Sequence, residues 1–231
     1  MAEFADLQDT LGIAFRDPSL LQQALVHRSY LHENPDFALP ANERLEFLGD
    51  SLLGFVIAAK LYRDFPHLTE GGMTKLRAAL VRKETLARLA SSLRLGDYLY
   101  MGRGEESSGG RTKQTILAGA FESLVGAIMM DQGFAAARDF VLRLFAGEMG
   151  RALEERLTTD YKSRLQEIVQ ARHRVTPIYR ITKEVGPDHA KEFTVEVIVG
   201  GSVIGRGHGG SKRVAEMEAA RDALDSLARE Q

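Results

Sequence analysis

Residues 42–51 have the sequence Asn42-Glu43-Arg44-Leu45-Glu46-Phe47-Leu48-Gly49-Asp50-Ser51, which places three carboxylates in an otherwise apolar, helix-like segment. Residues three and four apart share one face of a helix, so Glu43, Glu46 and Asp50 fall on one stripe. The leucines between them face the other way, as in a helix packed against a core. Like charges on one stripe repel, and a cation is the usual compensation. The stretch therefore predicts a site for a divalent metal ion that prefers oxygen ligands.

A second helical segment, residues 115–130, carries Glu122 as its only charge. Taken alone, a single glutamate among apolar side chains is as often paired or at the edge of a helix as it is functional. Beside the first stripe it becomes a candidate fourth carboxylate. Clusters of this kind hold Mg²⁺ or Mn²⁺, which lower the pKa of a bound water and neutralise phosphate oxygens during hydrolysis.

The composition limits the class of protein. The 231 residues are 44% hydrophobic and 27% charged, which is ordinary for a soluble globular protein, and the net charge of −2 indicates no particular partner. The absence of cysteine excludes disulfides, cysteine zinc sites and thiol nucleophiles. The longest apolar run, residues 52–59, is too short for a membrane span, and the N-terminus lacks a signal pattern. We expect a cytoplasmic protein that does not associate with membranes.

The hydrophobic period changes along the chain and predicts two domains. Residues 20–149 have helical spacing nearly throughout, whereas the C-terminal part combines helices with alternating, strand-like segments. The predicted C-terminal elements are a helix at 160–171, strands at 178–184, 192–199 and 202–207, a Gly200-Gly201 hairpin, and a helix from Ser211 to about 228. The fold class is an all-α N-terminal domain, residues 1–157, followed by an α+β domain of order α-β-β-β-α, residues 158–231. We expect a short linker at residues 158–160 and a mobile loop at residues 104–110.

These motifs resemble the ribonuclease III family. Residues 42–51 match its signature, and the likeness extends through residues 25–30, 70–81 and 116–131. The C-terminal part is similar to that family's double-stranded-RNA-binding domain. The resemblance implies a homodimeric endoribonuclease that depends on Mg²⁺, with Mn²⁺ as an alternative, and that needs no small-molecule cofactor. It also implies cleavage of double-stranded RNA to 5′-phosphate and 3′-hydroxyl ends, in the processing of ribosomal, messenger and other structured RNA precursors.

The resemblance also assigns roles by position. Glu46, Asp50 and Glu122 fall on the family's metal-binding carboxylates, and of these Asp50 and Glu122 are the catalytic candidates. Glu43 and Glu70 fall on accessory acidic positions. Phe47 falls where the family inserts an aromatic side chain into a socket on the partner subunit, and the alternative is an ordinary core phenylalanine.

The chain departs from the family pattern at Gly119, where an aspartate that binds metal is expected. One explanation is a ridge of small residues for close helix packing, formed by Gly119, Ser123, Gly126 and Ala127. Another is that water replaces the ligand or that metal affinity is weakened, and a third is an inactive member of the family. We predict that hydrolysis survives with three carboxylates. The rival is a catalytically weakened or silent dimeric protein that only binds double-stranded RNA.

The C-terminal domain offers three elements for contact with RNA. Ser163, Gln166 and Gln170 share a helix face that could reach 2′-hydroxyls in a minor groove, although a solvated face has the same pattern. His189 lies in a loop that resembles the family's second minor-groove contact. Lys212 and Arg213 open the last helix, where cations and backbone N–H groups face phosphate together.

Two further motifs have ordinary structural explanations. His27 lies in an apolar helical segment, which favours a structural role over metal binding. The residues Gly49-Asp50-Ser51-Leu52 also match the nucleophile motif of a lipase and esterase family. That family places its serine after a strand, whereas Ser51 lies within a helical pattern, so the esterase hypothesis is disfavoured.

Overall fold

The structure, a computed structural model, describes residues 4–187 and 191–229, apart from the side chains of residues 154–160. It divides into two compact units, Met1–Met149 and Gly150–Gln231. None of the described helices is long and apolar enough to cross a membrane.

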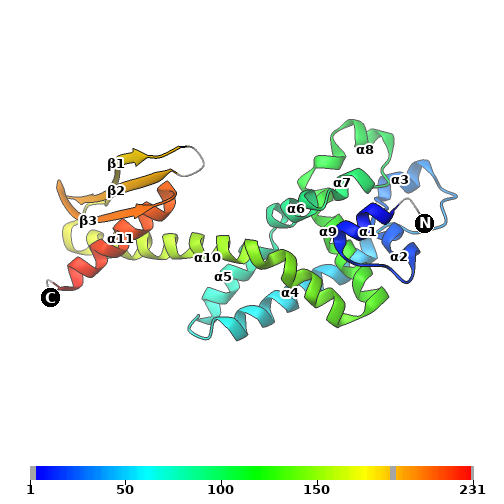
Figure 1. Ribbon diagram of the computed structural model, residues 1–231, viewed down its shortest axis with the longest axis horizontal. Helices are drawn as coiled ribbons and strands as arrows, with labels where there is room; N and C mark the ends of the chain where they lie inside the picture. Colours follow the sequence, from blue (N-terminus) through cyan, green and yellow to red (C-terminus); the bar gives the residue numbers. More distant parts are fainter. Residues whose placement is uncertain (1–3, 188–190, 230–231) are drawn as a thin grey trace. The chain divides into compact units, whose positions relative to one another are not determined.

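The first unit is helical, as the spacing of its apolar residues predicts (Figure 1). Its helices are α1 (Ala5–Leu11), α2 (Pro18–Ala24), α3 (Arg28–Glu33), α4 (Glu43–Asp64), α5 (Glu70–Val81), α6 (Lys83–Ser92), α7 (Leu95–Tyr98), α8 (Arg103–Ser107), the 3₁₀ turn η2 (Gly110–Thr112), α9 (Gln114–Gln132) and the start of α10 (Phe134–His173). Most of α9 is buried, and α2, α4 and α6 pack around it. The core of this unit therefore has α9 at its centre.

The crossing of α4 and α9 depends on two glycines. A Cβ atom built on Gly49 would lie 1.7 Å from the carbonyl oxygen of Glu122, and one built on Gly126 would lie 2.2 Å from that of Leu45. Both distances are far below van der Waals contact, so any side chain there would push the backbones apart. The two helices thus approach backbone to backbone, which carries the acidic stripe of α4 to Glu122 on α9.

The second unit has the order helix, three strands, helix. The end of α10 leads into β1 (Ile178–Val185), β2 (Glu192–Val199) and β3 (Ser202–Gly209), and α11 (Lys212–Arg229) closes the unit. The strands form one antiparallel sheet in the order β1-β2-β3. Gly200 and Gly201 join β2 to β3 with φ angles of 57° and 88°, the backbone that a two-residue hairpin turn requires. The predicted α-β-β-β-α order is confirmed.

One face of the sheet packs against α10 and α11. Alternate residues of β2, which are Phe193, Val195, Val197 and Val199, are buried there as their spacing predicts. The small residues Ala219, Ala220 and Ala223 of α11 are fully buried against the sheet. The helices can lie close to the strands because a Cβ on Gly207 would lie only 2.1 Å from the carbonyl oxygen of Ala215.

Two predictions about irregular segments are wrong. Helix α10 runs without a break through residues 158–160, where we expected a linker. Two threonines lower helix propensity by only a few tenths of a kcal/mol each, and neither Pro nor Gly interrupts the helix there. Residues 104–110 contain α8 and the beginning of η2 rather than an irregular loop. The domain boundary at 157/158 stays a prediction.

Candidate active site

The close crossing of α4 and α9 gathers the three carboxylates that we predicted as metal ligands. Glu46 and Glu122 are half-buried, and Asp50 is exposed beside them. Burial, reinforced by the charges of Asp50 and Glu46, raises the pKa of Glu122 to about 7. Burial, followed by the charge of Glu43, also raises the pKa of Glu46. The cluster is therefore a place of concentrated negative charge that a cation would relieve.

A cation from the protein already acts on the cluster. Lys83, the first residue of α6, lowers the pKa of both Glu46 and Glu122 through its charge. Its side chain is exposed, so it compensates the carboxylates only in part. The sequence does not predict this interaction, because the position of Lys83 at the start of α6 says nothing about its distance from α4 or α9.

The residues present fit a hard divalent ion, although the site is not closed. Carboxylate oxygens from three side chains are the ligands that Mg²⁺ and Mn²⁺ prefer. Among the described residues, no three His, Asp or Glu side chains already stand close enough together to hold a metal ion. The Glu46 carboxylate lies against Gly119: a Cβ built there would lie 2.8 Å from Glu46 Oε2.

Gly119 has a different role from the other small residues of α9. Gly126 meets the α4 backbone, as the packing ridge predicts, and Ser123 is fully buried. The atoms nearest to a Cβ on Gly119 would be those of the Glu46 carboxylate, which is the mobile end of a side chain, and not backbone atoms. Helix packing therefore does not require glycine at this position, and the packing explanation is wrong for Gly119.

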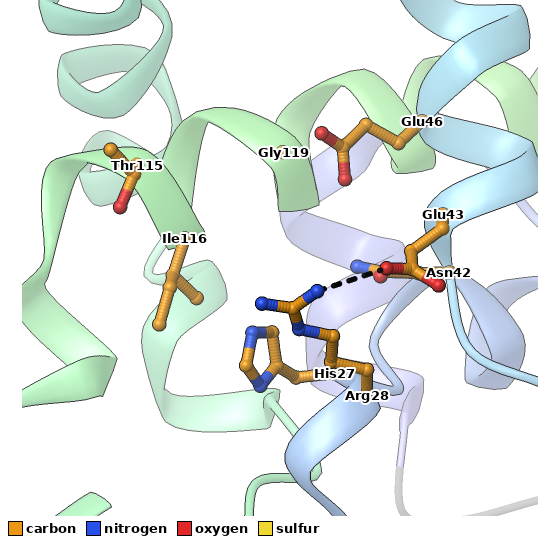
Figure 2. A pocket seen from close by; sticks show the side chains of 8 residues that line it. All are labelled: His27, Arg28, Asn42, Glu43, Glu46, Thr115, Ile116 and Gly119. Carbon is orange, nitrogen blue, oxygen red and sulfur yellow. Dashed lines mark ion pairs between the residues drawn. The ribbon is translucent and has the colours of Figure 1, made fainter. Parts of the chain in front are cut away.

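A pocket of about 240 Å³ opens beside Gly119 (Figure 2). One wall is acidic and is formed by Glu43 and Glu46, while His27 and Arg28 approach from α3 and the turn before it. The Arg28 guanidinium lies 3.7 Å from the Glu43 carboxylate, and both side chains are exposed. The full lining is His27, Arg28, Asn42, Glu43, Glu46, Thr115, Ile116 and Gly119.

Two predicted site residues lie elsewhere. Glu70 is the first residue of α5, where its carboxylate accepts a hydrogen bond of 2.9 Å from the Thr74 hydroxyl. It lines a separate, mainly apolar hollow of about 210 Å³ between α4 and α5, together with Tyr62 and Met73. The chain by itself does not bring Glu70 to the carboxylate cluster. Phe47 is 77% exposed, so the alternative of a core phenylalanine is wrong.

Helix α4 presents an apolar face to solvent. Phe47, Phe55 and Tyr62 recur every seven or eight residues, which keeps them on one side of the helix, and all three are exposed. Met130 and Phe134 add further exposed apolar surface, and the Phe134 ring lies 5.9 Å from the Phe55 ring. An exposed apolar surface of this size indicates a place of association.

In the second unit, the predicted RNA contacts lie at the surface. Ser163, Gln166 and Gln170 are exposed on α10, while Leu165 and Val169 on the same helix are buried in the core. His189 lies outside the described residues.

The N-terminus of α11 is capped as expected. The Ser211 hydroxyl accepts a hydrogen bond of 3.2 Å from the Val214 N–H, and Lys212 and Arg213 are exposed beside it. Glu216, one turn further on, forms an ion pair of 2.7 Å with Lys162 of α10. The acidic side chain is thus held by a lysine within the unit rather than left facing the basic helix start.

Comparison with known proteins supports both units. The sequence profile described as "Ribonuclease-III-like" matches residues 17–149, and the one described as "Double-stranded RNA binding motif" matches residues 161–227. Ribonuclease 3 from Dehalococcoides mccartyi (strain CBDB1) is 48% identical over 227 residues, which cover 98% of this chain and 96% of that protein. Ribonuclease 3 from Pelotomaculum thermopropionicum is 49% identical over 94% of this chain and 90% of that protein.

Solved structures agree with the fold of the first unit. The crystal structure of the nuclease domain of ribonuclease III from Campylobacter jejuni is 40% identical, with a TM-score of 0.58. The match covers 64% of this chain and 97% of the Campylobacter jejuni domain. A second structure of that domain, described as showing flexibility in a region involved in dimer formation, is 41% identical with a TM-score of 0.57, over 61% of this chain and 94% of that one. Together with the two profiles and the full-length relatives, this likeness shows that the chain belongs to the ribonuclease III family.

Proposed function

We propose that this endoribonuclease cuts double-stranded RNA with Mg²⁺, or Mn²⁺, held by Glu46, Asp50 and Glu122, and that it leaves 5′-phosphate and 3′-hydroxyl ends. The observation that carries the proposal is the crossing of α4 and α9, which gathers these carboxylates and raises the pKa of Glu122 to about 7. When bound, the ion supplies an activated water and neutralises charge on the phosphate oxygens. Asp50 and Glu122 are the proposed catalytic pair.

The protein side chains have separate tasks in this proposal. Glu122 is half-buried among apolar residues of α9, so it fixes the ion against a rigid helix, whereas Asp50 is exposed and faces the solvent from which RNA arrives. Glu43 is held by Arg28 at the pocket edge and serves as an accessory acid. Glu70 is the second accessory acid, from its separate position on α5.

The second unit would hold the duplex by shape. Ser163, Gln166 and Gln170 would contact 2′-hydroxyls in one minor groove, and His189 would contact the next. Lys212 and Arg213, at the capped start of α11, would contact the phosphates between them. These contacts favour RNA over DNA because they use the 2′-hydroxyl and the A-form groove, and they read little base sequence.

A homodimer is part of the same proposal, with a second copy covering the apolar face of α4. The hollow beside Tyr62 and Met73 measures about 210 Å³, and cavities of about 150 Å³ are known to hold a benzene ring. Phe47 of one copy therefore fits the hollow of the other by size and by polarity. Glu70 and Arg77 at the edge of this hollow would then lie near the partner copy.

A cleavage assay with the full-length protein tests the central proposal. Purified wild type with Mg²⁺ should cut a long RNA duplex, and its products should accept a 5′ label only after phosphatase treatment. Asp50→Asn should bind the duplex equally well but fail to cut it. If neither protein cuts, and Gly119→Asp does, then the missing ligand at position 119 abolishes activity and the rival, a silent RNA-binding protein, is correct.

The cellular task that we propose is the processing of ribosomal and other structured RNA precursors in the cytoplasm. It rests on family membership and on the shape-based binding described above. Deleting the gene should lead to accumulation of unprocessed ribosomal precursor, and wild type but not Asp50→Asn should restore processing. Normal precursor levels after deletion would contradict this part of the proposal alone.

A further inference from the structure

His27 is held rigidly at the mouth of the pocket beside Gly119. Its backbone N–H donates to the Tyr100 carbonyl oxygen at 3.0 Å, and its side chain caps α3. The ring atom Nδ1 lies 2.7 Å from the Ser29 hydroxyl and accepts the Ser29 backbone N–H at 3.3 Å. The ring therefore has a fixed orientation, with Nδ1 turned toward α3.

The hydrogen bonds around Ser29 determine where the ring proton is. The Ser29 hydroxyl oxygen accepts the Gly102 N–H at 3.0 Å, which leaves its own proton free to be donated to Nδ1. Nδ1 thus receives two donors and carries no proton itself. Burial lowers the pKa of His27, so the ring is neutral near pH 7. In a neutral ring with a bare Nδ1, the proton is on Nε2.

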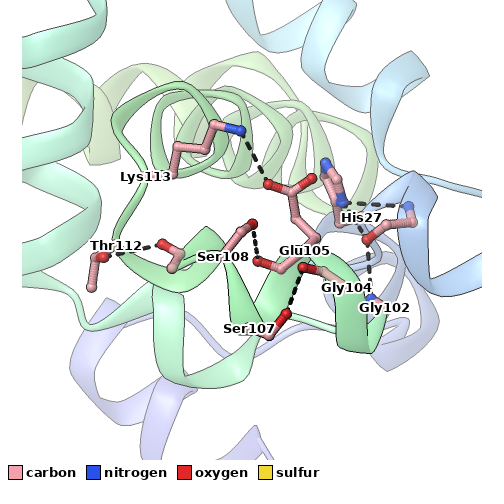
Figure 3. Close-up of polar contacts among 10 residues, drawn as sticks. His27, Gly102, Gly104, Glu105, Ser107, Ser108, Thr112 and Lys113 are labelled. Atoms are coloured by element: carbon pink, nitrogen blue, oxygen red, sulfur yellow. Dashed lines mark hydrogen bonds and ion pairs between the residues drawn. The ribbon is translucent and has the colours of Figure 1, made fainter.

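This Nε2–H group has no acceptor among the described residues. Only Nδ1 of His27 forms side-chain hydrogen bonds there. Glu105 acts on the ring through its charge without a hydrogen bond to it, and Oε1 of its carboxylate is paired with the Lys113 ammonium group at 3.1 Å (Figure 3). A protonated nitrogen has no lone pair for a metal ion, so His27 does not replace the ligand missing at position 119. What remains is a fixed hydrogen-bond donor on a residue that lines the pocket.

We propose that this pocket is a subsite for a phosphate group of the RNA strand being cut, and that His27 Nε2–H donates to one of its non-bridging oxygens. This inference rests on the proposed function. Arg28 supports the same phosphate, because its exposed pair with Glu43, at 3.7 Å, costs little to exchange. The pocket volume of about 240 Å³ accommodates a phosphate and part of a ribose but is small for a whole nucleotide. His27 is thus a positioning donor for the substrate backbone, in a pocket that Glu46 of the carboxylate cluster also lines.

Two substitutions of His27 separate the donor from the helix cap. His27→Asn keeps an oxygen near the position of Nδ1 that can accept the Ser29 N–H, and asparagine is a favoured N-cap, but no donor reaches the position of Nε2. His27→Gln places an amide N–H near that position. Single-turnover cleavage by His27→Asn should be slower by roughly 10- to 100-fold, the usual effect of losing a hydrogen bond to a charged group. His27→Gln should recover most of the rate, and the thermal midpoint of His27→Asn should match wild type.

Nitrogen NMR of the histidine rings tests the inference without cleavage. In the Asp50→Asn background, which leaves the duplex uncut, the ring missing from the His27→Asn spectrum identifies His27. It should show the neutral form protonated on Nε2, and its Nε2 signal should move when duplex RNA and Mg²⁺ are added. A proton on Nδ1, or no response to RNA, overturns the inference, and so does unchanged cleavage by His27→Asn. Failure of wild type to cut would instead contradict the proposed function, and the ring signals would still decide the role of His27.

Discussion

Glu122 makes the stability of the metal-free protein depend on pH. Its pKa is about 7 in the folded protein because of burial and the nearby Asp50 and Glu46, against an ordinary value of 4.5 for glutamate. Well below pH 4.5 the carboxyl group is neutral in both the folded and unfolded states, so it does not lower the free energy of unfolding. As pH rises toward 7, the unfolded chain ionises first, so the free energy of unfolding falls.

Glu122→Gln should therefore stabilise the metal-free protein at about pH 8 and have little effect at about pH 4.5. The gain should be roughly 1–2 kcal/mol, because a partly exposed group is screened by solvent. Thermal unfolding with a metal chelator measures it, as a rise of a few degrees in the midpoint. Saturating Mg²⁺ should reverse the order, since wild type then gains binding energy that the variant lacks. Equal midpoints at both pH values would mean that Glu122 is not desolvated.

Gly119→Asp should strengthen metal binding. The nearest neighbour of a new Cβ would be the end of the Glu46 side chain, 2.8 Å away, which can move, so the substitution is compatible with the helix crossing. An added carboxylate should lower the Mg²⁺ concentration for half-maximal cleavage by roughly 10-fold, the scale on which even outer ligand partners act. Gly119→Ala is the matched control, because it adds the Cβ without a ligand and should leave the Mg²⁺ requirement unchanged. The same shift in both variants would attribute the effect to Glu46 moving, not to the new carboxylate.

At the scale of residues, spacing predicts which side chains can meet but not what they do there. The stripe of Glu43, Glu46 and Asp50 follows from helical periodicity, and the structure places Glu122 beside it. The tautomer of His27 could not be predicted, because it depends on the Gly102 N–H, which lies 73 residues from Ser29 in the sequence. The exposure of Phe47 was equally open, since an apolar residue on a helix gives the same pattern in a core and in an interface.

At the scale of elements, the helix crossing explains why glycine is needed at position 49. Gly49→Ala should destabilise the first unit, because the new methyl group would collide with the Glu122 carbonyl oxygen and the backbones must separate. We expect a loss of roughly 1–3 kcal/mol and a loss of cleavage, since separation also moves the carboxylates apart. Gly54→Ala, on the same helix, has no atom within 4 Å of the new methyl group and should gain up to about 1 kcal/mol. If urea unfolding ranked the two variants the other way round, the close crossing would be wrong.

The short helices α8 and η2, which the sequence did not predict, are stabilised by side-chain contacts that local sequence patterns do not reveal. Directly after the segment expected to be a loop, residues 104–110, the Arg111 guanidinium donates to the carbonyl oxygens of Gly96 and Leu99 at 2.8 and 3.1 Å. It also pairs with Glu106, and Lys113 pairs with Glu105. Composition rich in glycine and serine predicts flexibility because it carries no record of such partners. The strands and α11 were predicted closely because alternation and small-residue spacing are local signals.

At the scale of the whole molecule, the exposed face of α4 determines whether the protein can work as a single copy. Phe47 is 77% exposed and Tyr62 is 75% exposed, so no described part of the chain covers these side chains. In the proposed dimer it is covered by a second copy, and a charge placed on it would then be buried without a partner. In a monomer the same charge carries no desolvation penalty, because the side chain is already in water.

Phe47→Asp should therefore shift the protein to monomers while leaving each chain folded. Analytical ultracentrifugation at micromolar concentration should give the mass of two chains for wild type and of one chain for the variant. Ile178→Asp is the matched control: Ile178 is 62% exposed on β1 of the other unit, so the same change there should leave the dimer intact. Duplex binding through the second unit should persist in Phe47→Asp, whereas cleavage of both strands in one encounter should be lost. A wild type that sediments as a single chain at every concentration would show that the apolar face of α4 has another occupant.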